Sequence, residues 1–268
     1  MAGASRSRAS QRARGAAPFE RVGLLDLRIA DDKTFSRIPL YAALEQSLVR
    51  SKYTFRTLPR GASWDRAAFL NLTYWAPEMG GDVLTEKRLG ADVVAHVALH
   101  QLVAHALPNN VRRTSAALFL GESVASAFDV YLLGWHLRLG ASSEFMETQL
   151  SAMSEVATSA GLTTKRFESL LQGCAEDPLL AFESLRGLLY AATSKLLKAK
   201  DPEGGERALR SFAQHPFYPL LHHYELSNWV LFAKAYGDRT AKVSPVSRLE
   251  REFRSSKETL ASLVVRSL

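Results

Sequence analysis

Apolar residues recur along most of the chain at the three- and four-residue spacing of an α-helix, and helix-ending residues separate the apolar stretches. One boundary is Pro108-Asn109-Asn110, and another is Asp177-Pro178, an N-cap aspartate followed by proline at the first helical position. The pattern predicts helices with ends placed to within a few residues. They are expected at about 39–51, 64–75, 82–107, 114–139, 142–160, 163–173, 177–199, 205–214, 217–236 and 245–264.

Only two segments, 22–30 and about 53–58, have an extended pattern, and strands do not alternate with helices along the chain. The expected fold is therefore all-α: a single compact multi-helix domain over 20–268. The two most apolar helices, 82–107 and 114–139, are joined by a short connection and should form a buried, central, antiparallel pair. Neither GxxxxGK[ST] nor GxGxxG occurs, so the sequence carries no signal for a phosphate-binding loop.

Composition is ordinary for a folded protein, but the charge is concentrated at the two ends. Of the formal net charge of +7, residues 1–15 contribute four arginines without an acid. Residues 237–268 contribute seven basic and four acidic residues, and the middle of the chain is balanced. Residues 1–19 are expected to be a disordered basic tail, with an organellar transit peptide as the less favoured alternative. Since the folded part lacks a basic surplus, we do not expect specific nucleic-acid binding.

The single cysteine, Cys174, excludes an intrachain disulfide and a Cys-rich zinc module, and no motif around it suggests a catalytic thiol. No apolar run approaches the roughly 18–20 residues that span a bilayer. We therefore expect a cytoplasmic protein without a transmembrane segment.

Three histidines occur within the very apolar segment 91–107. A buried imidazole needs hydrogen-bond or metal partners, because leaving its nitrogens unsatisfied costs about 1–3 kcal/mol. At about 100° per residue, Asp92, His96 and His100 share one helix face, and the two histidines have the i, i+4 spacing at which two imidazoles bind one metal ion. His105 lies near the opposite side and joins them only if the helix contains a one-residue widening.

The next apolar segment, 114–139, carries two carboxylates, Glu122 and Asp129, seven residues apart and therefore on one side of the helix. Carboxylates in an apolar helix are costly unless they are paired or bind a cation. His96, His100 and Glu122 would together form a two-histidine, one-carboxylate set for zinc or non-haem iron.

Two further side chains are expected to support this set. Asp129 is placed to hold a ligand imidazole through its free N–H, and His105 is assigned to the same supporting layer. The alternative is a buried ion-pair or hydrogen-bond network, for instance Glu122 with His96. Because both interpretations put the same residues in contact, only metal content separates them.

The arrangement resembles a zincin of the gluzincin kind, over residues 92–130 of this chain. In that family an HExxH helix supplies two zinc-binding histidines and a general-base glutamate, and a following helix supplies a third ligand from an ExxA-like run. Here His96-Val97-Ala98-Leu99-His100 keeps both histidines, and Gly121-Glu122-Ser123-Val124-Ala125 matches the carboxylate helix. Val97 occupies the general-base position, so the resemblance implies a metal site without the family's usual peptidase reaction.

Two features near the C-terminus have structural explanations. His222 and His223 lie at the start of an aromatic-rich helix, where bonds to neighbouring groups are expected rather than metal ligation. The amphipathic segment 245–268 is expected to dock on the body of the protein.

Two functions follow from the sequence. The first is a zincin-like protein with a metal site, used for metal-assisted hydrolysis with another base or for an oxidative reaction at iron. The second is a non-catalytic pseudoenzyme or scaffold that keeps the polar cluster as a structural core and binds a protein partner at its surface.

Overall fold

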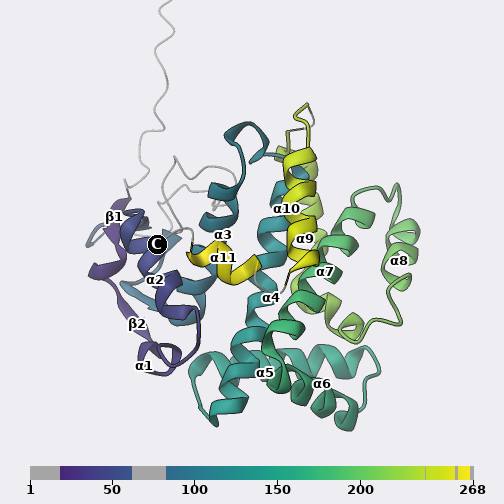
Figure 1. Cartoon of the computed structure of the whole chain (residues 1–268), viewed down its shortest axis with the longest axis horizontal. Coiled ribbons are helices and arrows are strands. Elements are labelled where there is room, and N and C mark those ends of the chain that lie inside the picture. The colour runs from purple at the N-terminus through teal and green to yellow at the C-terminus, as the bar shows by residue number, and fades with distance from the viewer. Residues whose placement is uncertain (1–18, 62–82, 239, 257–258, 266–268) are drawn as a thin grey trace, which may run out of the picture.

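The computed structural model describes residues 19–61, 83–238, 240–256 and 259–265, and most of these residues are helical (Figure 1). The predicted helix at 64–75 and nearly all of the predicted tail lie outside the described residues. The α-helices are α1 (Asp32–Phe35), α2 (Tyr41–Arg50), α3 (Ala91–Ala106), α4 (Ser115–Leu139), α5 (Glu144–Ser159), α6 (Thr164–Glu176), α7 (Pro178–Leu196), α8 (Pro202–Arg210), α9 (Leu226–Tyr236), α10 (Ser244–Ser255) and α11 (Thr259–Val265). Short 3₁₀ helices are η1 (Leu24–Asp26), η4 (Asn109–Val111) and η5 (Tyr218–Tyr224).

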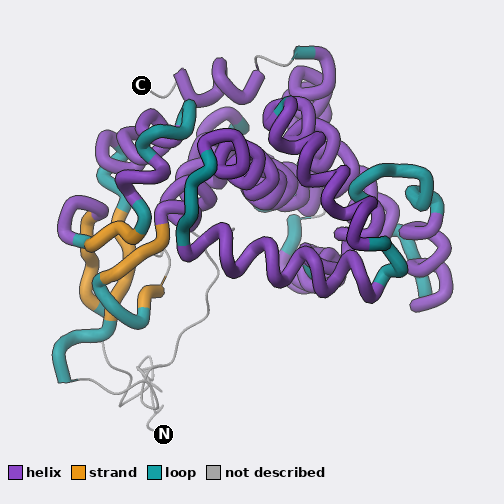
Figure 2. The backbone as a smooth tube through the Cα atoms, turned by 90° about the horizontal axis from the view of Figure 1, so that it is seen from below, coloured by secondary structure: helices purple, strands orange, loops and turns teal. Residues whose placement is uncertain are grey.

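Two small sheets correct the all-α expectation. Their strands, which Figure 2 shows gathered at one end of the molecule, are β1 (Glu20–Gly23), β2 (Arg28–Ala30), β3 (Thr54–Thr57), β4 (Val83–Leu84) and β5 (Arg88–Gly90). β3 pairs with β1 in antiparallel and with β4 in parallel orientation, while β2 and β5 form a separate parallel pair. The segment 83–90, predicted as the first turns of a helix, is therefore extended, because it pairs with strands from the distant N-terminal part of the chain.

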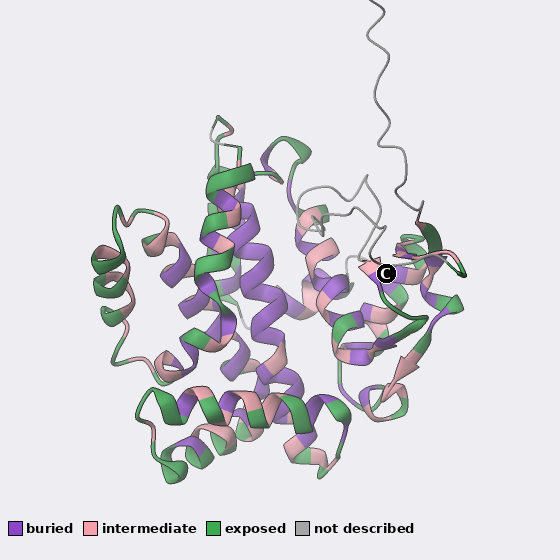
Figure 3. Ribbon diagram, turned by 180° about the vertical axis from the view of Figure 1, so that it is seen from behind, coloured by how far each residue is buried: buried purple, intermediate pink, exposed green. Residues whose placement is uncertain are grey.

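The long helix α4 forms the centre of the protein. It is buried over most of its length (Figure 3) and packs against α3, α6, α7 and α9. The Thr114 side chain accepts a hydrogen bond from the Ala117 amide at its start, and Gly140 ends it in the left-handed conformation at φ 56°. Among the described helices, α4 alone is long and apolar enough to cross a membrane, judged by length and composition. However, 89% of its apolar 18-residue segment is buried inside the protein. This burial is typical of a core helix.

Local capping signals place several helix starts correctly. Ser143 accepts a hydrogen bond from the Met146 amide at 3.1 Å, and Asp177 accepts one from Leu180 at 2.9 Å. The predicted helix at 217–236 is instead divided at Glu225, which has a φ of 48° between η5 and α9. Extended backbone at Ser256 likewise divides the predicted helix at 245–264 into α10 and α11.

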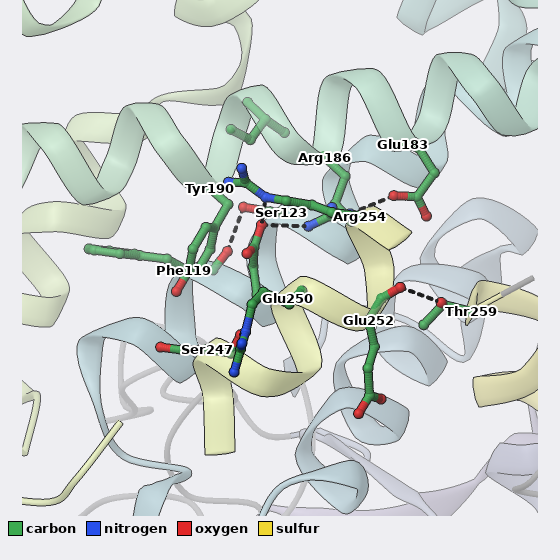
Figure 4. A network of polar contacts seen from close by, with 12 residues as sticks. Phe119, Ser123, Glu183, Arg186, Tyr190, Ser247, Glu250, Glu252, Arg254 and Thr259 are labelled. Atoms are coloured by element: carbon green, nitrogen blue, oxygen red, sulfur yellow. Dashed lines mark hydrogen bonds and ion pairs between the residues drawn. The ribbon is translucent and has the colours of Figure 1, made fainter. Parts of the chain in front are cut away.

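A buried arginine of α7 forms an ion pair with α10 (Figure 4). Arg186 is 1% exposed, donates a hydrogen bond to Glu183 at 3.0 Å, and places Nη1 3.7 Å from Glu250 of α10. Its guanidinium also lies 5.0 Å from the centre of the Phe253 ring, a cation–π contact. Together with the contacts of α11 with α2 and α3, this network confirms that the C-terminal segment docks on the body.

Candidate metal centre

Two helices bring His96, His100 and Glu122 together. The histidines lie one turn apart on α3, partly buried, and Glu122 lies on α4 with 3% of its surface exposed. The Nε2 atoms of the two imidazoles are 3.2 Å apart, and Nε2 of His100 is 3.6 Å from Oε1 of Glu122. One potential ligand atom from each residue lies within 4.8 Å of the other two. The structure thus groups the three side chains that the sequence selected as ligands.

These distances suit one metal ion. Two ligand atoms bound about 2.1 Å from zinc at the tetrahedral angle lie about 3.4 Å apart. The His96–His100 and His100–Glu122 separations of 3.2 and 3.6 Å fall on either side of that value. The third separation, between His96 and Glu122, is within 4.8 Å, so these two residues must approach each other to share one ion.

The protonation state of the imidazoles also suits metal binding. Burial lowers the pKa of His96 from its ordinary value of 6.5 to about 4. Burial, and then the neighbouring His96, lower the pKa of His100 well below 6.5. Both rings are consequently neutral at neutral pH, the form in which imidazole binds metal ions.

Gly121 makes room for one of the ligands. A Cβ atom at this position would lie 3.2 Å from Nδ1 of His100, closer than ordinary van der Waals contact. The missing side chain lets the His100 ring lie directly against the α4 backbone, beside Glu122. Gly121 belongs to the zincin-like run of the sequence, but its role could not be predicted there, because it depends on a side chain of a neighbouring helix.

The structure does not bring Asp129 and His105 to the imidazoles as expected. Within the described residues the Asp129 carboxyl has no hydrogen bond or ion pair, and its pKa is raised well above the usual value, chiefly by burial and then by Asp92. His105 is exposed and lines a groove together with residues of α10 and α11, on the opposite side of α3. α3 is a regular α-helix without a widened turn, so its helical period keeps His105 away from His96 and His100.

The other histidines lie outside the cluster and have structural partners or are exposed. His136 is fully buried, with Nδ1 2.8 Å from the Leu132 carbonyl oxygen and Nε2 3.0 Å from the Ser143 hydroxyl. His223 contacts Gln149 of α5 at 3.1 Å, and His222 is exposed, so both lie apart from the cluster.

Cys174 does not have the properties of a catalytic thiol. Its side chain is only 2% exposed, and burial raises its pKa to about 12. The thiol therefore stays protonated at neutral pH and behaves as a small core residue.

Comparisons of the chain with family models, with curated proteins and with solved structures found no match. The geometry of the His96, His100 and Glu122 cluster is therefore the basis on which a function can be proposed.

Proposed function

We propose that this protein binds one transition-metal ion, zinc or non-haem iron, through His96, His100 and Glu122. The observation that carries the proposal is the convergence of three ligand atoms within 4.8 Å, from two neutral imidazoles and a buried carboxylate. Two imidazoles and one carboxylate are a donor set that suits both metals and leaves positions for water or substrate.

The pairing of side chains along α3 and α4 supports a zincin-like helix pair. His100 is closest to Glu122, while the charge of Asp92, two turns earlier on α3, acts on Asp129, two turns later on α4. An earlier residue of α3 is thus paired with a later residue of α4. We infer from this order that the two helices run antiparallel.

The proposed site lacks the general-base glutamate of a zincin peptidase. Val97, at the position of the zincin general base, is 5% exposed and belongs to the apolar core. A hydrocarbon side chain cannot take a proton from a metal-bound water. The proposed activity is accordingly metal-assisted hydrolysis with a different base, if zinc is bound, or an oxidative reaction, if iron is bound.

A metal-free pseudoenzyme or scaffold is the second candidate function, and one contact favours it. The two Nε2 atoms are 3.2 Å apart, at hydrogen-bond distance, so one neutral ring can donate to the other without a cation. In that case the cluster is a structural core, and a protein partner would bind elsewhere on the surface.

Metal analysis of the purified full chain tests the proposal. After chelation and reconstitution with Zn²⁺ or Fe²⁺, the wild-type chain should retain about one ion per molecule after desalting. The double variant His96→Ala/His100→Ala should retain none, while the control His105→Ala, an exposed histidine on the same helix, should bind like wild type. A wild-type chain that retains neither metal, or a double variant that binds as well as wild type, contradicts the proposal.

Glu122→Gln provides a finer test of the donor set. It preserves shape but removes the anionic ligand, so affinity for Zn²⁺ should fall while the circular dichroism spectrum is unchanged. A Glu122→Gln chain with wild-type affinity would mean that the carboxylate is not a ligand.

A further inference from the structure

A groove of about 1080 Å³ lies between the ends of α2 and α3 on one side and the helices α10 and α11 on the other. Figure 1 shows α11 crossing from the end of α10 toward α2 and α3. The groove is lined by residues within 47–51, 101–108, 244–256 and 259–263, and we call it the C-terminal groove. Its volume is at the upper end of the range of small-molecule sites.

The helix α3 contributes to this groove and to the candidate metal centre by different faces. Gln101 and His105, one turn apart, line the groove. The ring of His100 instead lies against α4, where a Cβ atom on Gly121 would be 3.2 Å from its Nδ1 atom. Neither His96 nor His100 lines the groove, so a ligand there would occupy a site separate from the metal.

The lining of the C-terminal groove is polar. Seven of the eighteen residues that line it are serine or threonine, and no aromatic residue is found among these eighteen described residues. The apolar contribution is small and comes mainly from Leu102, Leu249 and Leu263. This lining does not suit an apolar ligand, and it offers no aromatic ring on which a nucleobase could stack.

Two arginines enter the groove from different sides, Arg50 at the end of α2 and Arg248 on α10. Arg248 is exposed and forms no ion pair or side-chain hydrogen bond with another described residue. Glu252 is the only acid among the described lining residues, and its carboxylate makes no ion pair within the described part of the chain. Positive charge is therefore in excess in the groove.

Other hydrogen-bond donors accompany the arginines. The Ser51 hydroxyl donates to Oε1 of Gln101 at 2.9 Å, which leaves the amide nitrogen of Gln101 as a donor. His105 offers a ring N–H in either protonation state. Some hydroxyls already have a structural use, since Thr259 donates to the Glu252 carbonyl oxygen at 2.8 Å (Figure 4). The guanidinium, amide and imidazole groups are thus the main donors available to a ligand.

Guanidinium groups match the oxygens of a phosphate group with paired N–H donors. We propose that the C-terminal groove binds a small molecule bearing phosphate groups, held between Arg50 of α2 and Arg248 of α10. Gln101 and His105 of α3 supply further donors to the phosphate oxygens. This site does not depend on a bound metal ion, so its test is independent of the function proposed above.

Calorimetric titration of inorganic pyrophosphate into the metal-free full chain at pH 7 and constant ionic strength tests the site. The wild-type chain should bind one pyrophosphate. Arg50→Gln and Arg248→Gln should each weaken the affinity by about tenfold or more, as expected for the loss of a charge-assisted hydrogen bond. Arg251→Gln is the matched control, because Arg251 is an exposed arginine of α10 that does not line the groove, and it should bind like wild type.

Amide hydrogen exchange of the wild-type chain provides a second measurement that needs no variant. A ligand that contacts both sides of the groove stabilises the docking of α10 on the body, because it binds only when the two sides are together. Pyrophosphate should therefore slow exchange in residues 47–51 and 244–256 and leave exchange in α6 unchanged. Unchanged exchange in both groove segments at saturating pyrophosphate overturns the proposal.

The titrations also distinguish a phosphate site from general attraction of anions to a basic chain. Equal weakening by all three arginine variants, equal affinity for malonate and pyrophosphate, or no binding of pyrophosphate at millimolar concentration overturns the proposal. A comparison of inorganic phosphate with ribose 5-phosphate identifies the source of the ligand. Tighter binding of ribose 5-phosphate supports an organic phosphate, and equal binding of the two supports free phosphate.

Discussion

Acidification of the metal-free protein should destabilise it steeply, because His96 and His100 are partly buried and are neutral in the folded chain. The pKa of His96 is about 4 in the folded chain, against an ordinary value of 6.5. Between these values the unfolded chain binds a proton that the folded chain does not, so stability falls as pH drops below 6.5 and the loss is complete near pH 4.

The expected size follows from the same two values. At about 1.4 kcal/mol for each pH unit, His96 alone lowers the free energy of unfolding by about 2 kcal/mol at pH 5 and by about 3 kcal/mol at pH 4. His100 adds to this loss, since its pKa is also lowered well below 6.5, chiefly by burial. The two contributions are not independent, because the rings are 3.2 Å apart and protonation of one opposes protonation of the other.

Urea unfolding in a chelating buffer at pH 7, 6, 5 and 4.5 measures the effect. Other groups also titrate, so the informative quantity is the difference between wild type and His96→Asn at each pH. Wild type should lose about 2 kcal/mol more than His96→Asn between pH 7 and pH 5. His222→Asn should follow wild type, because its imidazole is exposed. Parallel losses in wild type and His96→Asn would refute the conclusion that burial keeps the His96 ring neutral.

Three substitutions test the supporting contacts. Gly121→Ala should crowd the His100 ring and weaken Zn²⁺ affinity roughly tenfold, as measured by competition with a chromophoric chelator. Gly187→Ala, a mid-helix glycine whose added Cβ would meet nothing within 4 Å, should leave Zn²⁺ affinity unchanged and raise the free energy of unfolding by about 0.5–1 kcal/mol. Arg186→Met should lower the free energy of unfolding by about 3–5 kcal/mol, measured by urea unfolding, because Glu183 and Glu250 lose the buried cation that they share. A loss below about 1 kcal/mol would contradict a buried ion network.

The parts of the fold that depend on local sequence could be predicted. Helix periodicity and caps placed α4 almost residue for residue, from its Thr114 cap to its end before Gly140. The shared face of His96 and His100 follows from the geometry of a single helix, and their meeting with Glu122 required only that the next helix pack against it. The candidate ligands were therefore accessible to sequence reasoning.

Features that depend on distant partners could not be predicted in this way. Residues 83–90 have enough helix-compatible character to extend the helical pattern, but β5 is extended because β2 pairs with it. Asp129 was expected to hold an imidazole, since it shares a face with Glu122, but within the described residues its carboxyl makes no hydrogen bond to a histidine, because it lies two helical turns further along α4.

The placement of polar groups within the apolar core favours a bound cation over a purely structural network. Residues 97–99, between the two histidines, are all buried and apolar, so this part of α3 accommodates hydrocarbon side chains readily. Hydrophobic residues of similar volume at the histidine and glutamate positions would be expected to give equal or greater stability, since buried polar and charged groups seldom repay their desolvation. A cation that binds only to the folded chain, and not to the unfolded chain, makes the polar residues stabilising, because its binding free energy adds directly to stability. The free energy of unfolding of the wild-type chain should therefore be higher with bound metal than without it. In the His96→Ala/His100→Ala chain, added metal should leave the free energy of unfolding unchanged.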